Sequence, residues 1–143
     1  RADLQAGPAT YDAFFQLSPF GNALVRLTVN GADLRVYLER LVSRREPNVH
    51  VSGTIVRYDP NGPAGSRIVN ATVGGAPLDP AHTYTITMND FMSAGGDGLA
   101  LARGASRVED TGVSDLDALL DYARTLPEGV VRPDAAPRLI AVP

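Results

Sequence analysis

One glycine-rich stretch of the sequence combines residue types that can bind a polar ligand. Asp97 lies inside a run that contains Gly95, Gly96 and Gly98, and an aromatic residue, Phe91, precedes it. Glycine tolerates positive φ, so the backbone can bend tightly here and approach a bound molecule. Successive amides in such a bend can converge on an anion or a sugar oxygen, whereas an ionised Asp only accepts hydrogen bonds. A paired diol, as on ribose, is a suitable donor to Asp97.

The same residues also have a purely structural interpretation. A strand is predicted over Tyr84–Met88, and a glycine-rich loop after a strand commonly only turns the chain. The four phenylalanines of the sequence are Phe14, Phe15, Phe20 and Phe91, and any of them can fill the core. Residue types alone therefore favour a structural turn and leave the ligand loop as the alternative.

No residue pattern in the sequence predicts catalysis. A two-metal phosphoesterase site needs several His, Asp and Asn ligands at close spacing. The only histidines, His50 and His82, have no neighbouring histidine or carboxylate at a suitable spacing, so we expect both to be structural. Neither a Gly-x-Ser-x-Gly elbow nor a phosphate-binding Gly-x-x-x-x-Gly-Lys run occurs. We assign no catalytic residue, no metal ligand and no cofactor to this chain.

The segment from Asn89 to Gly98 reads Asn-Asp-Phe-Met-Ser-Ala-Gly-Gly-Asp-Gly. It resembles the signature of the C-terminal domain of the 5'-nucleotidase family, which also includes UDP-sugar hydrolases and cyclic-nucleotide phosphodiesterase/3'-nucleotidases. Three other segments agree with that domain in order: Arg1 to Gly7, the Ser-Pro-Phe-Gly-Asn run at residues 18–22, and residues 51–59. The resemblance covers nearly the whole chain and is weakest from Ala105 onward.

The resemblance implies that this domain recognises a nucleotide or nucleoside. The implied substrate-binding residues are Phe20, Phe91, Asp97, Arg1, Gly95 and Gly96. In this interpretation the two phenylalanines clamp the base from its two faces, Asp97 accepts from the ribose hydroxyls, and Arg1 reaches toward ribose or phosphate. Stacking is worth roughly 1–3 kcal/mol per base and depends little on base identity, so such a clamp would tolerate several bases.

The resemblance also implies partners outside this chain. In the family, a pair of divalent metals belongs to an N-terminal metallophosphoesterase domain, so we interpret residues 1–143 as the C-terminal substrate-binding domain alone. The parent protein is expected to be a 5'-nucleotidase-like phosphoric ester hydrolase that is extracellular, periplasmic or at the cell surface, and this chain alone is expected to be inactive. The alternative is a non-catalytic surface or interaction module without nucleoside binding. Leu99, where an aromatic often follows the glycine run, is compatible with that alternative.

Composition limits the class of protein independently. A chain of 143 residues with 44% hydrophobic content can form one domain and bury about two-thirds of its unfolded surface. Cysteine is absent, which excludes a disulfide framework. The thirteen basic residues are all Arg, they are scattered, and the net charge is −3, so a basic stripe for nucleic acid is missing. No run approaches the roughly 20 apolar residues of a membrane span. Because the sequence opens on Arg1, we expect any export signal to lie upstream.

Helices and strands are predicted to position these residues. Asn30 caps a helix over residues 31–45 with one apolar stripe, and Ser114 with Asp117 caps a helix that ends near Thr125. A short helix is expected near residues 11–16. Strands are expected over residues 22–29, 49–58, 66–73, 84–88, 99–101 and, as an edge, 138–142. We therefore predict an α+β domain with a mixed β-sheet, hairpins and a few amphipathic helices.

Overall fold

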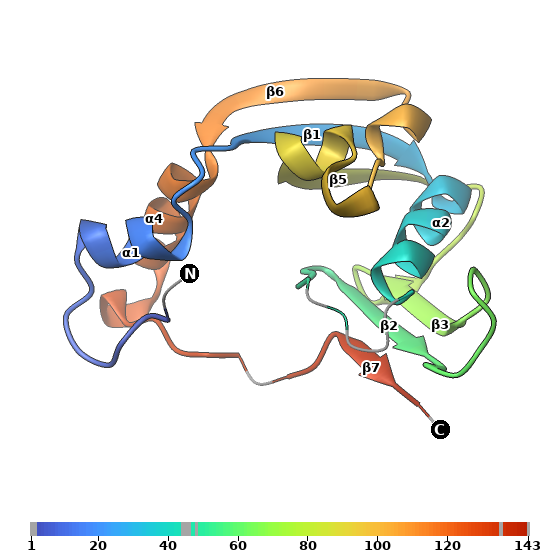
Figure 1. Cartoon of the computed structure of the whole chain (residues 1–143), viewed down its shortest axis with the longest axis horizontal. Coiled ribbons are helices and arrows are strands. Elements are labelled where there is room, and N and C mark those ends of the chain that lie inside the picture. Colours follow the sequence, from blue (N-terminus) through green and yellow to red (C-terminus); the bar gives the residue numbers. More distant parts are fainter. Residues whose placement is uncertain (1–2, 44–46, 48, 135, 143) are drawn as a thin grey trace.

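The computed structural model describes residues 3–43, 47, 49–134 and 136–142. Within them the helices alternate unevenly with strands, which confirms the α+β class (Figure 1). The elements in chain order are α1 (Tyr11–Leu17), β1 (Ala23–Asn30), α2 (Gly31–Leu41), β2 (Thr54–Tyr58), β3 (Ile68–Val73), β4 (Ala76–Pro77), β5 (Thr83–Asn89), α3 (Asp90–Ala94), β6 (Arg107–Ser114), α4 (Asp115–Thr125) and β7 (Leu139–Ala141). Short 3₁₀ turns are η1 (Gly96–Gly98), η2 (Ala102–Gly104) and η3 (Pro127–Gly129).

The strands form two sheets. A three-stranded antiparallel sheet has the order β5-β1-β6, with β1 at its centre. A four-stranded sheet has the order β4-β3-β2-β7, in which β7 is an edge strand parallel to β2. In Figure 1 the three-stranded sheet lies at the top, the four-stranded sheet lies at the lower right, and α2 lies between them. The helix α2 therefore joins the two parts of the hydrophobic core.

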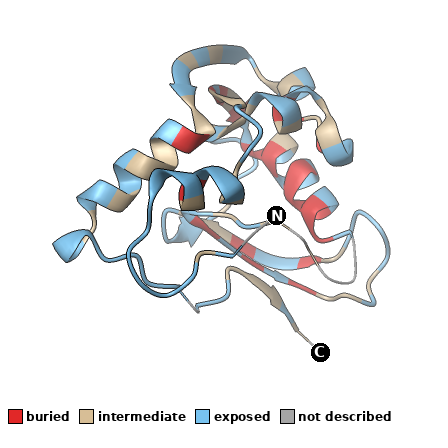
Figure 2. Cartoon of the chain, turned by 60° about the vertical axis from the view of Figure 1, so that its left-hand side comes forward, coloured by how far each residue is buried: buried red, intermediate tan, exposed pale blue. Residues whose placement is uncertain are grey.

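The core is built from alternating residues of β1 and from the apolar stripe of α2. Val25, Leu27 and Val29 are buried on β1 while the residues between them are more exposed, as expected for a strand with one covered face. Leu34 and Leu38 of α2 join the same cluster. Figure 2 shows the buried residues gathered on α2 and the neighbouring strands. Burial in this cluster also raises the pKa of the Tyr37 hydroxyl above its ordinary value of 10.0.

A buried carboxylate ties α2 to the four-stranded sheet. Glu39 is only 6% exposed. Its Oε2 accepts the backbone N–H of Arg67 at 2.9 Å, and its Oε1 accepts the backbone N–H of Ile68 at 3.0 Å. Both oxygens are thus paired inside the fold, as a buried charge requires.

The helix α2 starts at the predicted cap but ends earlier than predicted. The Asn30 side chain accepts the N–H of Asp33 at 2.8 Å, which confirms the N-cap. The helix ends at Leu41 instead of residue 45. The Arg67 guanidinium donates to the Val42 carbonyl at 3.0 Å and also contacts the Ser43 carbonyl, so a tertiary donor satisfies the carbonyls that directly follow the helix. Residues 44 and 45, the last two of the predicted helix, lie outside the described residues.

The observed helices and strands confirm some of the other sequence predictions and correct the rest. The short helix near residues 11–16, the capped helix ending at Thr125 and the edge strand near the C-terminus are confirmed as α1, α4 and β7. The strand predicted over residues 49–58 begins only at Thr54, and residues 99–101 form no strand. Leu99 and Leu101 are instead loop residues whose side chains enter the core. The strand β6 was not predicted, because its mostly exposed residues lack an apolar alternation.

Candidate functional site

The candidate site lies at one end of the three-stranded sheet. Antiparallel pairing of β1 with β5 sets Leu24 opposite Asn89, so the start of β1 and the end of β5 lie side by side. Phe20 comes shortly before β1, and Phe91 comes directly after β5. The segments that carry the two phenylalanines therefore lie at the same end of the sheet. The Phe20 segment leads from α1 into β1, and the Phe91 segment leads from β5 into α3 (Figure 1).

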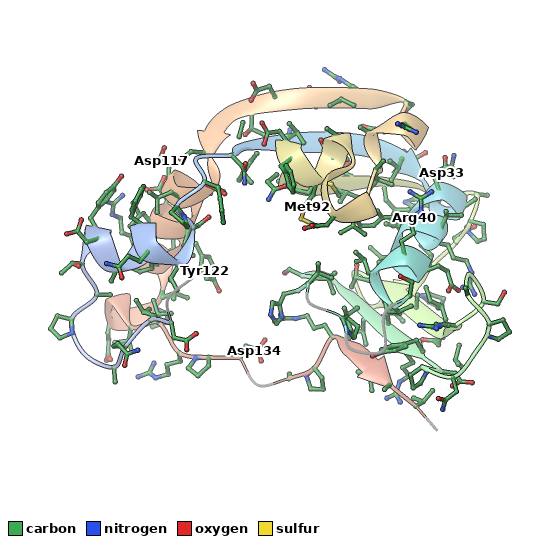
Figure 3. All side chains as sticks on the ribbon, in the orientation of Figure 1. Asp33, Arg40, Met92, Asp117, Tyr122 and Asp134 are labelled. Carbon is green, nitrogen blue, oxygen red and sulfur yellow. The ribbon has the colours of Figure 1, made fainter. Side chains whose placement is uncertain are left out.

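A short helix, rather than a simple loop, carries Phe91. The Asn89 side chain caps α3 by accepting the N–H of Met92 at 2.8 Å. Met92 packs against the core, and its side chain is labelled on α3 in Figure 3. Phe91, one position earlier, stays 54% exposed. The helix thus packs Met92 against the core and leaves the preceding residue, Phe91, half-exposed to solvent.

Two glycines shape the turn beneath Phe91. Gly95 ends α3 with φ +118°, a conformation that residues with a Cβ rarely adopt. At Gly96 a Cβ would lie only 2.3 Å from Cε1 of Phe91. The phenyl ring therefore lies directly on the Gly96 backbone, and any larger residue at position 96 would displace it.

Asp97 follows this contact at the centre of η1. It has φ +54°, one of two positive-φ positions occupied by a residue other than glycine in the described chain. Its side chain is exposed, and none of the described residues donates a hydrogen bond to its carboxylate or pairs with it. A carboxylate in this state keeps its full capacity to accept hydrogen bonds from a ligand.

Asp97 lines a cavity of about 280 Å³, just below the usual range of small-molecule sites. The other lining residues are Arg40, Leu41, Ser43, Val49, Gly98 and Leu99. Arg40, labelled on α2 in Figure 3, donates from Nη1 to the Ala100 carbonyl at 3.2 Å. Leu99, which follows the turn, is only 6% exposed and packs in the hydrophobic core. The Asp97 turn is therefore fixed to the C-terminal end of α2 and to the core.

Phe20 is held on a loop of different construction. It is 53% exposed, between Pro19 and Gly21. The flanking Ser18 and Asn22 both donate to Oδ2 of Asp115, at 3.0 Å and 3.4 Å. Sequence reasoning did not single out Asp115, because its neighbour Ser114 explained the start of α4 as a helix cap. The only sequence signal was a second acidic residue in the first turn of α4, beside Asp117.

The predicted site residues thus fall into three groups. Phe91, Gly95, Gly96 and Asp97 lie together on one continuous turn. Phe20 lies on a separate segment at the same end of the sheet. Arg1 lies outside the described residues, so its predicted role stays a prediction.

Neither histidine lines the cavity that contains Asp97. His82 packs edge-on against Tyr84, with ring centroids 4.9 Å apart, and His50 lines a separate cavity of about 290 Å³ with Arg138 and Leu139. In the part of the chain that the structure describes, no three His, Cys, Asp or Glu side chains are grouped so as to hold a metal ion. In the same residues no helix is long and apolar enough to cross a membrane.

Comparison with known proteins identifies the family. Residues 1–103 match the family described as 5'-nucleotidase, C-terminal domain, so the chain belongs to this family. The solved structure of a 5'-nucleotidase precursor from Thermus thermophilus superposes with a TM-score of 0.85 at 34% identity, over 95% of this chain and 28% of that one. The family resemblance and the α+β fold inferred from the sequence are confirmed.

Two curated relatives extend the comparison. Endonuclease YhcR of Bacillus subtilis (strain 168) is 30% identical over 139 residues, which are 91% of this chain and 11% of that protein. The snake venom 5'-nucleotidase of Crotalus adamanteus is 29% identical over 146 residues, which are 94% of this chain and 24% of that protein. The chain thus spans a quarter or less of the length of these two relatives.

Proposed function

We propose that this domain binds the nucleoside part of a nucleotide substrate, with Phe91 stacking on the base and Asp97 accepting hydrogen bonds from the ribose hydroxyls. The observation that carries the proposal is the turn from Phe91 to Asp97. It holds an exposed ring over Gly96 and, one residue later, an exposed carboxylate that no described residue pairs with. An aromatic face and a diol acceptor so close in the chain match the two halves of a nucleoside.

Phe20 supplies the second face of the base in this proposal. It is about as exposed as Phe91, and its segment leaves the same end of the three-stranded sheet. Each of the two half-exposed rings leaves apolar area in contact with water. A base between the rings would cover both.

The whole protein, in this proposal, is a 5'-nucleotidase-type hydrolase. A pair of divalent metals and the hydrolytic chemistry belong to an N-terminal phosphoesterase domain, which is the partner of the present domain. Because metals and nucleoside would then be held by different domains, turnover should require domain closure. The occurrence of a relative in snake venom supports an extracellular, periplasmic or cell-surface location.

Titration of the chain with adenosine, followed by NMR, tests the binding proposal. We expect selective shifts of the amides of Phe91, Gly95, Gly96 and Asp97 and of residues 18 and 20–22. The amides of β3 and β4 in the other sheet serve as the internal control and should not move. A chain that shows no shifts at millimolar adenosine would overturn the proposal and favour an interaction module that has the fold but no nucleoside site.

A further inference from the structure

The loop that carries Phe20 is held by one residue of a helix far away in the sequence, Asp115. Oδ2 of Asp115, the first residue of α4, accepts from the Ser18 hydroxyl at 3.0 Å and from the Asn22 side-chain amide at 3.4 Å. The backbone N–H of Asp115 also donates to the Asn22 carbonyl at 2.9 Å. Three contacts from one residue thus hold the loop on both sides of Phe20.

The loop needs such external support because of its own sequence. Gly21, beside Phe20, has φ +61°, and a Cβ there would meet no heavy atom within 4 Å. The Cβ side of Gly21 is therefore open, and glycine restricts the backbone little. Asp115 adds a restraint from outside the loop.

Asp115 is not needed to start α4. The Ser114 side chain already accepts the N–H of Asp117 at 3.0 Å, and the Ser114 hydroxyl donates to the Asp117 carboxylate at 2.8 Å. The second oxygen of Asp115, Oδ1, is buried and has no hydrogen-bond partner among the described residues. A carboxylate with one buried and unpaired oxygen costs stability. Helix capping therefore does not explain the Asp at position 115.

We infer that Asp115 is a positioning residue that holds the Phe20 ring in place for the base. This inference rests on the proposed function, because it assigns Asp115 an effect on binding that acts through Phe20. Asp115 fixes Ser18 and Asn22, so the loop is already ordered before the ligand binds. The loop then loses less conformational entropy on binding, which increases the affinity.

The first test measures loop order without ligand. Backbone relaxation of Phe20 and Gly21 should give order parameters near the rigid value of about 0.85 in the wild-type chain and below about 0.6 in Asp115→Ala. Asp115→Asn, which keeps the shape and replaces the charged acceptor with a neutral carbonyl oxygen, should lie between them. Asp121→Asn is the matched control: it removes an exposed carboxylate of the same helix that pairs with Arg124, and it should leave the loop unchanged.

The second test measures adenosine affinity. We expect Asp115→Ala to weaken binding about tenfold. Adding Phe20→Ala to Asp115→Ala should cost less than Phe20→Ala costs alone, because a residue that acts only through another is not additive with it. The ratio of ribonucleoside to dideoxynucleoside affinity, which reports on Asp97, should not change.

The outcomes separate the two proposals. If wild-type chain binds adenosine and Asp115→Ala keeps both an ordered loop and full affinity, the positioning role is overturned while the proposed function stands. Fully additive losses for Asp115→Ala and Phe20→Ala would also overturn it. If the wild-type chain does not bind adenosine, the proposed function fails first and the positioning role fails with it.

Discussion

Glu39 and Asp97 are two carboxylates in opposite circumstances. Glu39, in the α2 region, is 6% exposed, and each of its oxygens accepts a backbone N–H of the fold. Asp97, in the turn after α3, is exposed, has positive φ, and accepts no hydrogen bond from a described residue. The first carboxylate uses its hydrogen-bonding capacity to hold the structure together. The second keeps that capacity available, which is what a ligand site requires.

The aromatic residues show the same contrast. Phe14 is 6% exposed and Phe91 is 54% exposed. Burial marks Phe14 as a core residue, while Phe91, in contact with Gly96, stays about half exposed. Mutations in the two regions should therefore have different readouts, stability in one and ligand binding in the other.

The largest effect is expected for the core aromatic. Phe14→Ala should lower the free energy of unfolding by about 3–5 kcal/mol, because it removes a buried ring and leaves a cavity. Phe91→Ala should cost about 1 kcal/mol or less, as for a half-exposed side chain. Chemical denaturation of both variants measures this difference. Equal losses would mean that Phe91 is a structural residue and that the contrast between the regions is wrong.

The next effect concerns the buried carboxylate. Glu39→Ala should destabilise the chain by about 3 kcal/mol, because the backbone N–H groups of Arg67 and Ile68 lose a charged acceptor in the interior. Asp121→Ala, which breaks an exposed pair with Arg124, is the control and should cost at most about 0.5 kcal/mol. A Glu39→Ala variant as stable as this control would show that the carboxylate does not hold α2 to β3.

A smaller effect is expected at the glycine beneath Phe91. Gly96→Ala should weaken adenosine binding by about 1–3 kcal/mol, the worth of one stack, because the new methyl group displaces the ring. The same substitution in a Phe91→Ala background should change affinity little, since the clashing partner is gone. Calorimetric titration of the four proteins of this cycle measures the coupling. Equal penalties in both backgrounds would show that the Gly96 contact does not act through Phe91.

The smallest effect on stability is expected at Asp97. Asp97→Gly should change the free energy of unfolding by about 0.5 kcal/mol or less, because glycine accepts the positive φ and no described residue loses a hydrogen bond. Asp97→Ala is less suitable, since alanine is strained in this conformation. Thermal unfolding compares the variants. A large loss for Asp97→Gly would place Asp97 in the same structural class as Glu39.

The sequence predicted local structure better than long-range contacts. The caps of α2 and α4 lie within three residues of their partners, so residue types were sufficient to place them. The strand β6 was missed because its stability comes from pairing with β1, far away in the sequence, rather than from its own apolar pattern. The apolar character of residues 99–101 predicts a strand, yet Leu99 and Leu101 enter the core from a loop.

The candidate site divides in the same way. Glycines around Asp97 predicted a tight turn, because positive φ is a local property, whereas the ligand role of the turn was implied by the family resemblance. The contact of Phe91 with Gly96 could not be predicted, since it depends on how α3 ends. Asp115 was missed because its partners Ser18 and Asn22 are 97 and 93 positions away. Such hydrogen bonds leave no periodicity or spacing in the sequence.

The most direct test of the account compares ribonucleosides with their 2',3'-dideoxy counterparts in wild-type chain and Asp97→Gly. If Asp97 reads the sugar, wild-type chain should favour adenosine over dideoxyadenosine, and Asp97→Gly should lose about 1.5–3 kcal/mol with adenosine but little with the dideoxy ligand. Phe91→Ala should penalise both ligands equally. If Asp97→Gly instead weakens both ligands to the same extent, the carboxylate shapes the turn rather than recognising ribose, and the central claim is contradicted.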